Sequence, residues 1–355
     1  IMDKILFITR YFGEMMGGTV CSNRNRESLE KIFNKVIEYR IIDKVGKRKI
    51  YSKIEQLLFG YMGGIDQIDK NNITQIIKQN QCNHIFIDSS LLGYLSKYIK
   101  EKFPNIEITC FFHNFEYNYI KATCKGIKRN LYMRWAFKNE KMACKYSTHI
   151  ITLNNRDAVL ISKYYKRVPD LCIPISIPDK YQEHKDKLLG EQTYMLFIGS
   201  YFPPNINGIT WFINNVLPFI NNKLIIVGKD MDKLYIPEIT KAKIHIYSNV
   251  PDLTPFYNNA KFMIMPIFSG SGMKVKTAEA LMYGKFIIGT QEAFEGYDIS
   301  EQEGIICNNA NEFIKSINEF SERSNFNKHS RDLYLNKYSF ESTLHSFIAL
   351  YKNEL

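Results

Sequence analysis

The sequence has no long apolar run, so no segment of about 20 residues is available to cross a bilayer as a helix. The apolar run at residues 5–8 is also too short for the hydrophobic region of a signal peptide. The seven cysteines form no Cys-x-x-Cys pair and are odd in number, which argues against a disulfide framework and a zinc site. These absences lead us to expect a cytoplasmic protein with reduced cysteines.

Repeats and low-complexity tracts are also absent. A chain of 355 residues exceeds the size at which one hydrophobic core stops growing, so two domains are expected. Residues 1–180 hold 30 Lys and Arg against 17 Asp and Glu, whereas residues 181–355 hold 17 against 19. The two halves are therefore expected to meet different partners, and the basic half suits nucleic acid, an anionic membrane or an anionic substrate.

The stretch from Pro266 to Asp298 carries the clearest chemical pattern. It begins at the end of an apolar run that we interpret as a buried parallel strand. Three small residues there let a ligand approach the backbone at the start of a helix, where an anion is stabilised: Gly270, Ser271 and Gly272. Lys274 adds a cation, and Glu279, about one helical turn further on, can accept two hydroxyl hydrogen bonds from one sugar ring. This pattern predicts a nucleoside diphosphate pocket, and a glycine-rich turn with solvated Lys and Glu is the alternative.

The order of strand, glycine turn, helix, second strand and loop resembles the donor-binding segment of retaining nucleotide-sugar glycosyltransferases of family 4. The resemblance implies an α/β fold in which two Rossmann-like domains face each other across a cleft (GT-B), with a C-terminal helix crossing back to the first domain. It places an acceptor domain at residues 1–178, a nucleotide-sugar donor domain at 179–338 and the returning helix at 339–355.

In that family two glutamates with seven residues between them bracket the glycine turn. Glu279 matches the second, which holds the ribose, but the first falls on Ser271, so a carboxylate that usually touches the donor sugar is missing. His113 matches a histidine near the donor sugar. Asn114 and Glu116 complete its motif, either as cleft contacts or as residues that shape the loop by hydrogen bonds.

The resemblance implies catalytic roles for His113, Lys274 and Glu279. It implies donor binding by Gly17, Gly18, Gly199, Ser200, Tyr247, Val250, Gly270, Ser271, Gly272, Met273, Val275 and Thr277. Many relatives carry an Arg and a Lys for the diphosphate after the first strand of the second domain. This chain has neither between Gly199 and Trp211, so Lys274 is expected to carry more of the phosphate charge.

The function implied is a retaining glycosyltransferase of cell-surface polysaccharide biosynthesis, which needs no metal or other cofactor. Its expected partners are a nucleoside diphosphate sugar as donor and a saccharide or lipid-linked saccharide as acceptor. One alternative is a nucleotide-sugar epimerase; another is a non-catalytic sugar-nucleotide binding subunit, which would suit Ser271 and the missing basic pair. Nucleic acid is not expected, because the basic residues carry no nucleic-acid motif.

A basic loop at Lys44–Lys53 leads into apolar residues at helical spacing. With the basic run Lys121–Lys145, read as one surface helix, this amphipathic helix predicts peripheral binding at an anionic inner membrane surface. The alternative is that its apolar face packs on the first sheet.

Overall fold

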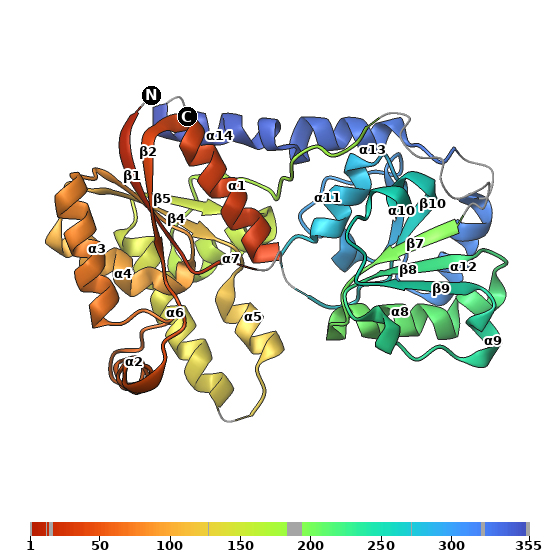
Figure 1. The fold of residues 1–355 in the computed structure, drawn as a ribbon, viewed down its shortest axis with the longest axis horizontal. Helices are drawn as coiled ribbons and strands as arrows, with labels where there is room; N and C mark the ends of the chain where they lie inside the picture. Colours follow the sequence, from red (N-terminus) through yellow and green to blue (C-terminus); the bar gives the residue numbers. More distant parts are fainter. Residues whose placement is uncertain are drawn as a thin grey trace. The chain divides into compact units, whose positions relative to one another are not determined.

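The structure is a computed structural model that describes residues 2–11, 13, 17–126, 128–182, 194–270, 272–320 and 324–352. The chain forms two compact units, residues 1–174 with 343–355, and residues 175–342 (Figure 1). The sequence placed these divisions at 178/179 and 338/339. Two prolines, Pro174 and Pro178, and a polar run predict the interdomain linker between Pro169 and Glu191, which lies partly outside the described residues.

The first unit is built on a parallel sheet with the order β2-β1-β3-β4-β5-β6. Its strands are β1 (Met2–Thr9), β2 (Phe33–Arg40), β3 (His84–Ile87), β4 (Glu107–Phe112), β5 (His149–Thr152) and β6 (Leu171–Cys172). Its helices are α1 (Gly17–Ile32), α2 (Gly46–Phe59), α3 (Gln67–Asn80), α4 (Gly93–Lys102), α5 (Glu116–Thr123), α6 (Lys128–Tyr146) and α7 (Asn155–Tyr165). The apolar runs of the central strands are buried, as expected of a parallel sheet with helices packed on it.

The C-terminal helix α14 (Phe340–Lys352) begins in the second unit and continues in the first. Phe347 lies 6.4 Å from the ring of Phe86 on β3, and the hydroxyl of Tyr351 is 3.0 Å from that of Thr109 on β4. The end of the chain therefore packs on the first sheet.

The second unit repeats the plan with the parallel order β12-β11-β10-β7-β8-β9. Its strands are β7 (Tyr194–Ile198), β8 (Leu224–Gly228), β9 (Ile244–Ser248), β10 (Ala260–Met265), β11 (Ile287–Gly289) and β12 (Gly304–Ile306). Its helices are α8 (Pro203–Asn215), α9 (Glu238–Lys241), α10 (Thr254–Asn259), α11 (Val275–Met282), α12 (Ala310–Glu319) and α13 (Lys328–Leu333). The prediction of two Rossmann-like domains is thus confirmed.

In each sheet the chain builds one side first and then crosses to the other. The switch point therefore lies between the neighbouring strands β1 and β3 in the first unit and between β7 and β10 in the second. Ligands of open α/β sheets bind outside the carboxyl ends of the strands at this switch point. The loops after β1 and β3, and those after β7 and β10, are therefore where each unit should hold its ligand.

Two elements differ from what the sequence predicts. The helical spacing of Leu29, Ile32, Phe33 and Val36 predicts one helix, but α1 ends at Ile32, because Phe33 opens the edge strand β2 and pairs with β1. The basic run is two helices, α5 and α6; Cys124 ends α5 in an extended conformation, and Gly126 has a positive φ of 75°. No helix of the described residues is long and apolar enough to span a membrane.

Candidate active site

The glycine turn lies between β10 and α11, beside the switch point of the second sheet. Gly272 adopts φ = 59°, a left-handed conformation that side chains rarely tolerate, and so turns the chain into α11. Ser271 lies outside the described residues. The free N–H groups at the start of a helix favour an anion, so this turn can seat a phosphate.

Lys274 immediately precedes α11, and its ammonium group stays close to the turn. Nζ lies 3.0 Å from the carbonyl oxygen of Gly272 and forms an ion pair with Glu292. Glu292 belongs to the short 3₁₀ turn Gln291–Phe294 after β11. The cation is therefore held next to the helix start, and its side chain is only 10% exposed.

Glu279 lies on α11, and its carboxylate accepts a 2.9 Å hydrogen bond from the hydroxyl of Tyr257 on α10. Burial raises the pKa of Glu279, while the Tyr257 hydrogen bond and the charges of Lys180 and Lys276 act in the opposite direction. One carboxylate oxygen is thus fixed by Tyr257, and the other makes no hydrogen bond with another described residue. This arrangement suits an acceptor for ligand hydroxyl groups.

Lys276 is a second lysine at the same turn that the sequence interpretation missed. Its Nζ donates a 2.7 Å hydrogen bond to Oδ1 of Asn205 on α8, and it lies 5.1 Å from the ring centre of Phe197 on β7. Burial lowers the pKa of Lys276 to about 7. Because α8 follows β7 and α11 follows β10, Lys276 connects the two sides of the switch point.

The loops after β7, β8 and β9 complete this edge of the sheet. A Cβ at Gly228 would lie 1.9 Å from the carbonyl oxygen of Gly199, so glycine permits the close approach of the first two loops. Ser200 is exposed. The ring of Tyr247 packs on Phe256 with ring centres 4.9 Å apart, and Val250 is half-buried.

Three of the predicted donor-binding residues make structural contacts or are only half-exposed: Met273, which lies two residues before α11, and Val275 and Thr277 on α11. The Thr277 hydroxyl is buried and donates to the carbonyl oxygen of Ala293 at 2.9 Å. The sulfur of Met273 is 3.4 Å from the backbone nitrogen of Ile175. Val275 is half-buried at the first position of α11, so only its backbone is placed at the helix start.

In the first unit His113 follows β4 and is 4% exposed. Its Nε2 lies 3.1 Å from the carbonyl oxygen and 3.2 Å from the carboxylate of Asp88, which follows β3. Burial alone would lower the pKa of His113, but the Asp88 carboxylate, with a contribution from Cys21, raises it to about 10. The ring is therefore an imidazolium at neutral pH.

Asp88 also accepts hydrogen bonds from Thr9 at 3.0 Å and Asn25 at 2.8 Å, which fix its position between β1 and α1. The ring of Tyr11 lies 4.4 Å from that of His113, at the end of β1. Gly18 allows this packing, because a Cβ there would lie 2.7 Å from the Tyr11 ring, whereas Gly17 is exposed. His113 thus sits at the switch point of its own sheet.

Asn114 and Glu116 contact each other through a 3.4 Å hydrogen bond, and Glu116 is buried. Burial raises the pKa of Glu116. The buried carboxylate of Glu140, which the sequence interpretation missed, accepts the backbone N–H groups of Glu116 and Tyr117 at the start of α5. Burial and the neighbouring Glu116 raise the pKa of Glu140 to about 8. These contacts shape the loop after β4.

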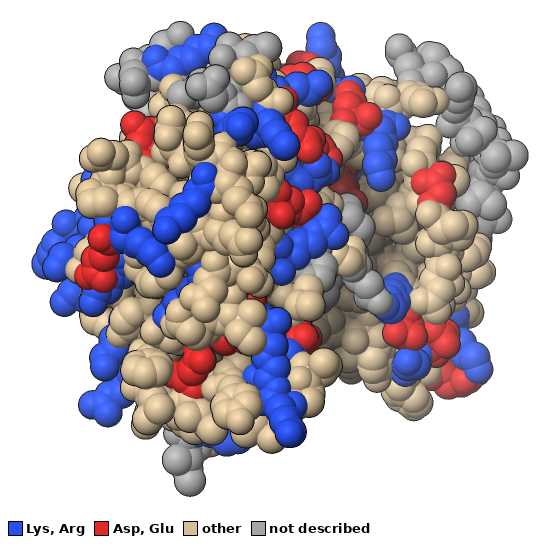
Figure 2. All heavy atoms as spheres, turned by 60° about the vertical axis from the view of Figure 1, so that its left-hand side comes forward, with Lys and Arg blue, Asp and Glu red and all other residues tan. Residues whose placement is uncertain are grey.

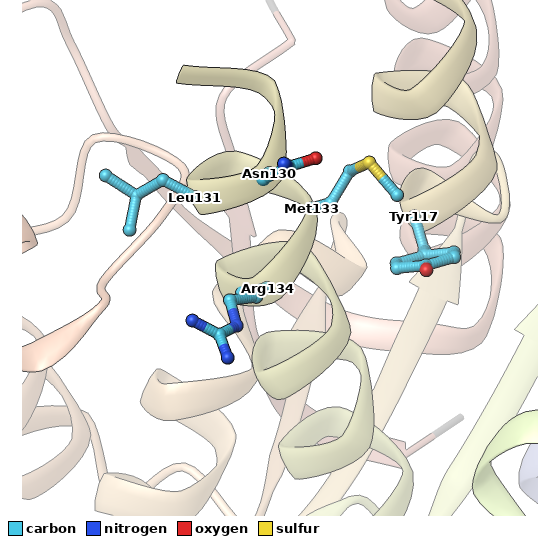
Figure 3. Close-up of a pocket in the computed structure, with 5 residues that line it drawn as sticks. All are labelled: Tyr117, Asn130, Leu131, Met133 and Arg134. Carbon is cyan, nitrogen blue, oxygen red and sulfur yellow. The ribbon is translucent and has the colours of Figure 1, made fainter. Parts of the chain in front are cut away.

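A separate hollow of about 420 Å³ lies between α5 and α6 (Figure 3). The residues that line it are Tyr117, Asn130, Leu131, Met133 and Arg134. None of the catalytic, donor-binding or cleft residues predicted from the sequence lines this hollow, although its α6 residues belong to the basic run Lys121–Lys145. Among the described residues no group of three or more His, Cys, Asp or Glu side chains could hold a metal ion.

Residues 192–323 match the model of a protein family described as glycosyl transferases group 1. The match covers the glycine turn, Lys274, Lys276 and Glu279, and extends over most of the second unit. Together with two parallel-sheet Rossmann-like units, it supports a transferase enzyme with the GT-B fold of glycosyltransferases.

One sequence relative is the uncharacterized 44.6 kDa protein in the cps region of Klebsiella pneumoniae, which is 27% identical over 229 residues. These residues are 59% of this chain and 58% of the relative, so the match spans less than two thirds of either protein.

Among solved structures, the fold is similar to sucrose-phosphate synthase from Thermosynechococcus elongatus, with a TM-score of 0.73, 12% identity and coverage of 99% and 98% of the two chains. It is also similar to Anabaena HepE in complex with UDP, with a TM-score of 0.71, 11% identity and full coverage of both chains. The apo lipopolysaccharide outer core galactosyltransferase WaaB gives a TM-score of 0.65, 13% identity and coverage of 99% and 100%.

Proposed function

We propose that the protein is a retaining glycosyltransferase, similar to family 4, that transfers a sugar from a nucleoside diphosphate sugar to an acceptor hydroxyl. The observation that carries the proposal is the group of Lys274, Lys276 and Glu279 around the glycine turn at the switch point of the second sheet. It offers two cations for a diphosphate and a carboxylate for ribose hydroxyl groups. The binding of UDP by HepE supports this class of donor.

In the proposed reaction the bond between the anomeric carbon and the diphosphate breaks, and a bond to the acceptor oxygen forms on the same face. The leaving diphosphate takes the acceptor proton. Lys274, Lys276 and the backbone N–H groups of the glycine turn stabilise the charge that develops on the diphosphate, so the proposal requires no metal. Lys276 would supply the charge that the loop after β7 lacks.

His113 contributes from the first unit in this proposal. The protonated ring has Nε2 on Asp88. In the proposed reaction this fixed positive charge acts near the donor sugar, which is the place that the resemblance to family 4 implies for His113. Asn114 and Glu116 then act by shaping the adjacent loop.

The acceptor that we propose is a saccharide or lipid-linked saccharide of cell-surface polysaccharide synthesis. The support for this assignment is the cps-region relative and the similarity in fold to WaaB, a lipopolysaccharide galactosyltransferase.

The first experiment is a thermal-shift screen of UDP, GDP, ADP and the corresponding diphosphate sugars. A ligand at about 100 times its dissociation constant adds roughly 2.7 kcal/mol of stability, which is readily detected. The donor found is then incubated with a panel of saccharide acceptors, and NMR of the product reports the anomeric configuration. Transfer with retention is expected. Interconversion of donors without an acceptor would show an epimerase, binding without any turnover would show a binding subunit, and an inverted product would refute the retaining mechanism.

Glu279→Gln is expected to weaken nucleoside diphosphate binding by roughly 1 to 3 kcal/mol, because a charged acceptor of hydroxyl hydrogen bonds becomes neutral. Isothermal titration with the diphosphate found in the screen measures this effect. Inorganic pyrophosphate, which has no ribose, provides the control and should bind both proteins equally. If the variant loses pyrophosphate binding to the same extent, Glu279 does not contact the ribose.

Lys276 predicts a pH dependence of donor binding. Because the pKa of the free enzyme's Lys276 is about 7, the lysine is largely neutral at pH 9, and a bound diphosphate must recover its proton. The dissociation constant is therefore expected to rise between pH 7.5 and 9, by at most about ten-fold per pH unit. Lys276→Arg, which stays charged, should bind with little change over this range. An equally steep profile in the Arg variant would assign the titration to another group.

A further inference from the structure

Helix α2 presents its polar side to the protein and its apolar side to solvent. Its half-buried residues are Arg48, Ser52, Glu55 and Gln56, and none of its residues is fully buried. Its exposed large apolar residues are Ile50, Tyr51, Ile54, Leu57, Leu58 and Phe59. This orientation is the reverse of that expected of a surface helix, and the prediction that the apolar face packs on the first sheet is wrong.

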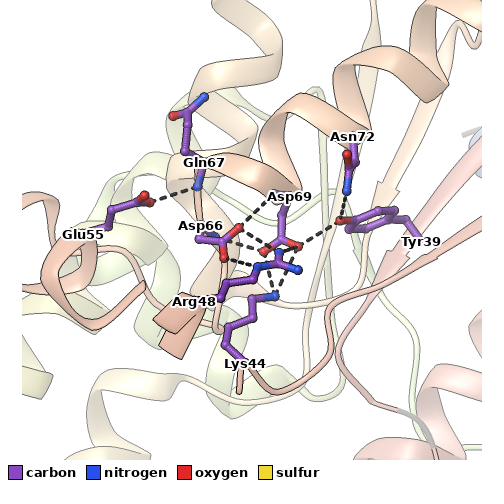
Figure 4. Close-up of polar contacts among 8 residues, drawn as sticks. All are labelled: Tyr39, Lys44, Arg48, Glu55, Asp66, Gln67, Asp69 and Asn72. Atoms are coloured by element: carbon purple, nitrogen blue, oxygen red, sulfur yellow. Dashed lines mark hydrogen bonds and ion pairs between the residues drawn. The ribbon is translucent and has the colours of Figure 1, made fainter. Parts of the chain in front are cut away.

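Ionic contacts hold α2 in this orientation (Figure 4). Arg48 binds the carboxylate of Asp66 at 2.7 Å and that of Asp69 at 2.8 Å, and Lys44 binds Asp69 at 2.9 Å. Hydrogen bonds from Arg48 and the Asp69 backbone lower the pKa of Asp66 to about 2, although burial acts in the opposite direction. The polar side of α2 is therefore firmly attached to the start of α3.

At the other end of the same polar side, Glu55 accepts a 2.9 Å hydrogen bond from the backbone nitrogen of Gln67. Glu55 is the sole acidic residue in the sequence of α2. Since it faces the protein, the outward surface of the helix combines apolar side chains with lysines. These exposed lysines are Lys47, Lys49 and Lys53.

We propose that α2 lies in the headgroup region of an anionic lipid membrane. The apolar side, in which Tyr51 is 65%, Leu57 64% and Leu58 70% exposed, would enter the boundary between headgroups and acyl chains. The three lysines would pair with lipid phosphates. Figure 2 shows Lys and Arg side chains spread over the face of the first unit that it turns forward, with Asp and Glu side chains among them. The inference is independent of the transfer reaction proposed above.

Charge complementarity favours lipid over a second copy of the chain, because two α2 surfaces would bring the same three lysines together. Apolar residues that continue along one helix side over two turns also suit a flat apolar layer. An apolar area of this kind that is left exposed to water otherwise favours association with another protein or with a membrane.

The test is co-sedimentation of the full chain with vesicles of phosphatidylcholine alone and of phosphatidylcholine with phosphatidylglycerol. We expect binding to the anionic vesicles and a decline with added salt, because the Debye length is roughly 8 Å at physiological ionic strength and shorter above it. Replacing Lys47, Lys49 and Lys53 by Gln should lower the partition coefficient on the order of 100-fold, about five-fold for each lysine. Leu57→Gln with Leu58→Gln should also remove binding.

Arg48 is retained in these variants, because its loss would leave Asp66 and Asp69 without their partner. The matched control replaces the exposed Lys31, Lys78 and Lys163 by Gln, which removes the same charge elsewhere in the first unit. Its binding should fall far less than that of the α2 variant. Equal loss in both triple variants, equal binding to neutral vesicles, or a dimer that dissociates when Leu57 and Leu58 are replaced would each overturn the proposal.

Discussion

Lys274→Ala is expected to lower the turnover number by about 10²- to 10³-fold while the protein stays folded, the usual loss when one preorganised charge-stabilising group is removed. The effect should be this large because the ammonium is held at the glycine turn by Gly272 and Glu292 before any donor arrives. The charge that develops on the leaving diphosphate then meets a cation that does not need to be repositioned. Single-turnover kinetics at saturating donor measure the chemical step directly.

A second variant separates loss of charge from collapse of the turn. Glu292→Gln removes the ion pair but leaves the Lys274 ammonium, so its turnover should remain much closer to that of the unaltered enzyme. Lys241→Ala, an exposed lysine of the same unit, serves as the control for general effects of charge. If Glu292→Gln loses as much activity as Lys274→Ala, Lys274 acts through its ion pair by holding the turn in place, and its charge does not stabilise the diphosphate. If Lys274→Ala retains turnover within a factor of three, Lys274 has no role at the phosphate.

Much of the fold was predictable because buried parallel strands read as continuous apolar runs. The apolar runs at residues 4–9, 195–199 and 260–267 each predict a strand, and β1, β7 and β10 occupy these segments. The edge strand β2 was not predictable in the same way. Only Phe33 is fully buried along it, so its apolar residues have no continuous run and happen to fit the helical spacing of the preceding residues.

The local part of the candidate site was also predictable, since the glycine turn, Lys274 and Glu279 lie within a few residues of each other. The long-range contacts were not. Lys276 contacts Asn205, 71 positions earlier in the sequence, because the chain crosses the sheet after β9 and places β10 beside β7. Sequence spacing carries no information about that crossing. A second lysine one helical turn before Glu279 was the signal available, but without the strand order it reads as a solvated residue.

The orientation of α2 illustrates the same limit. The amphipathic pattern predicts correctly that one side of the helix is apolar. Which side meets the protein depends on Asp66 and Asp69, which attract Arg48 from the start of a different helix. A polar contact of this kind reverses the usual rule, and nothing in the periodicity of α2 itself reveals it.

Asp88→Ala is expected to destabilise the first unit by about 3 to 5 kcal/mol, because it leaves the buried, protonated His113 without its anionic partner. The same change removes the acceptor of Thr9 and Asn25. The measurement is denaturant unfolding followed by Trp135 fluorescence in a Trp211→Phe background, because the two tryptophans lie in different units. Asp43→Ala, at an exposed position of the same unit, is the control and should change the free energy of unfolding little.

The pH dependence tests the electrostatic cause of this loss. The pKa of His113 is raised from 6.5 to about 10, so its protonation stabilises the folded state fully below pH 6.5, and that contribution disappears as the pH rises through 10. Asp88→Asn, which keeps the shape but removes the charge, should therefore be much less stable than the unaltered protein at pH 6, and the difference should narrow by pH 10. A constant difference between the two proteins from pH 6 to 10 would show that Asp88 acts through its neutral hydrogen bonds alone, and His113 would then not be the fixed cation that the proposed reaction uses.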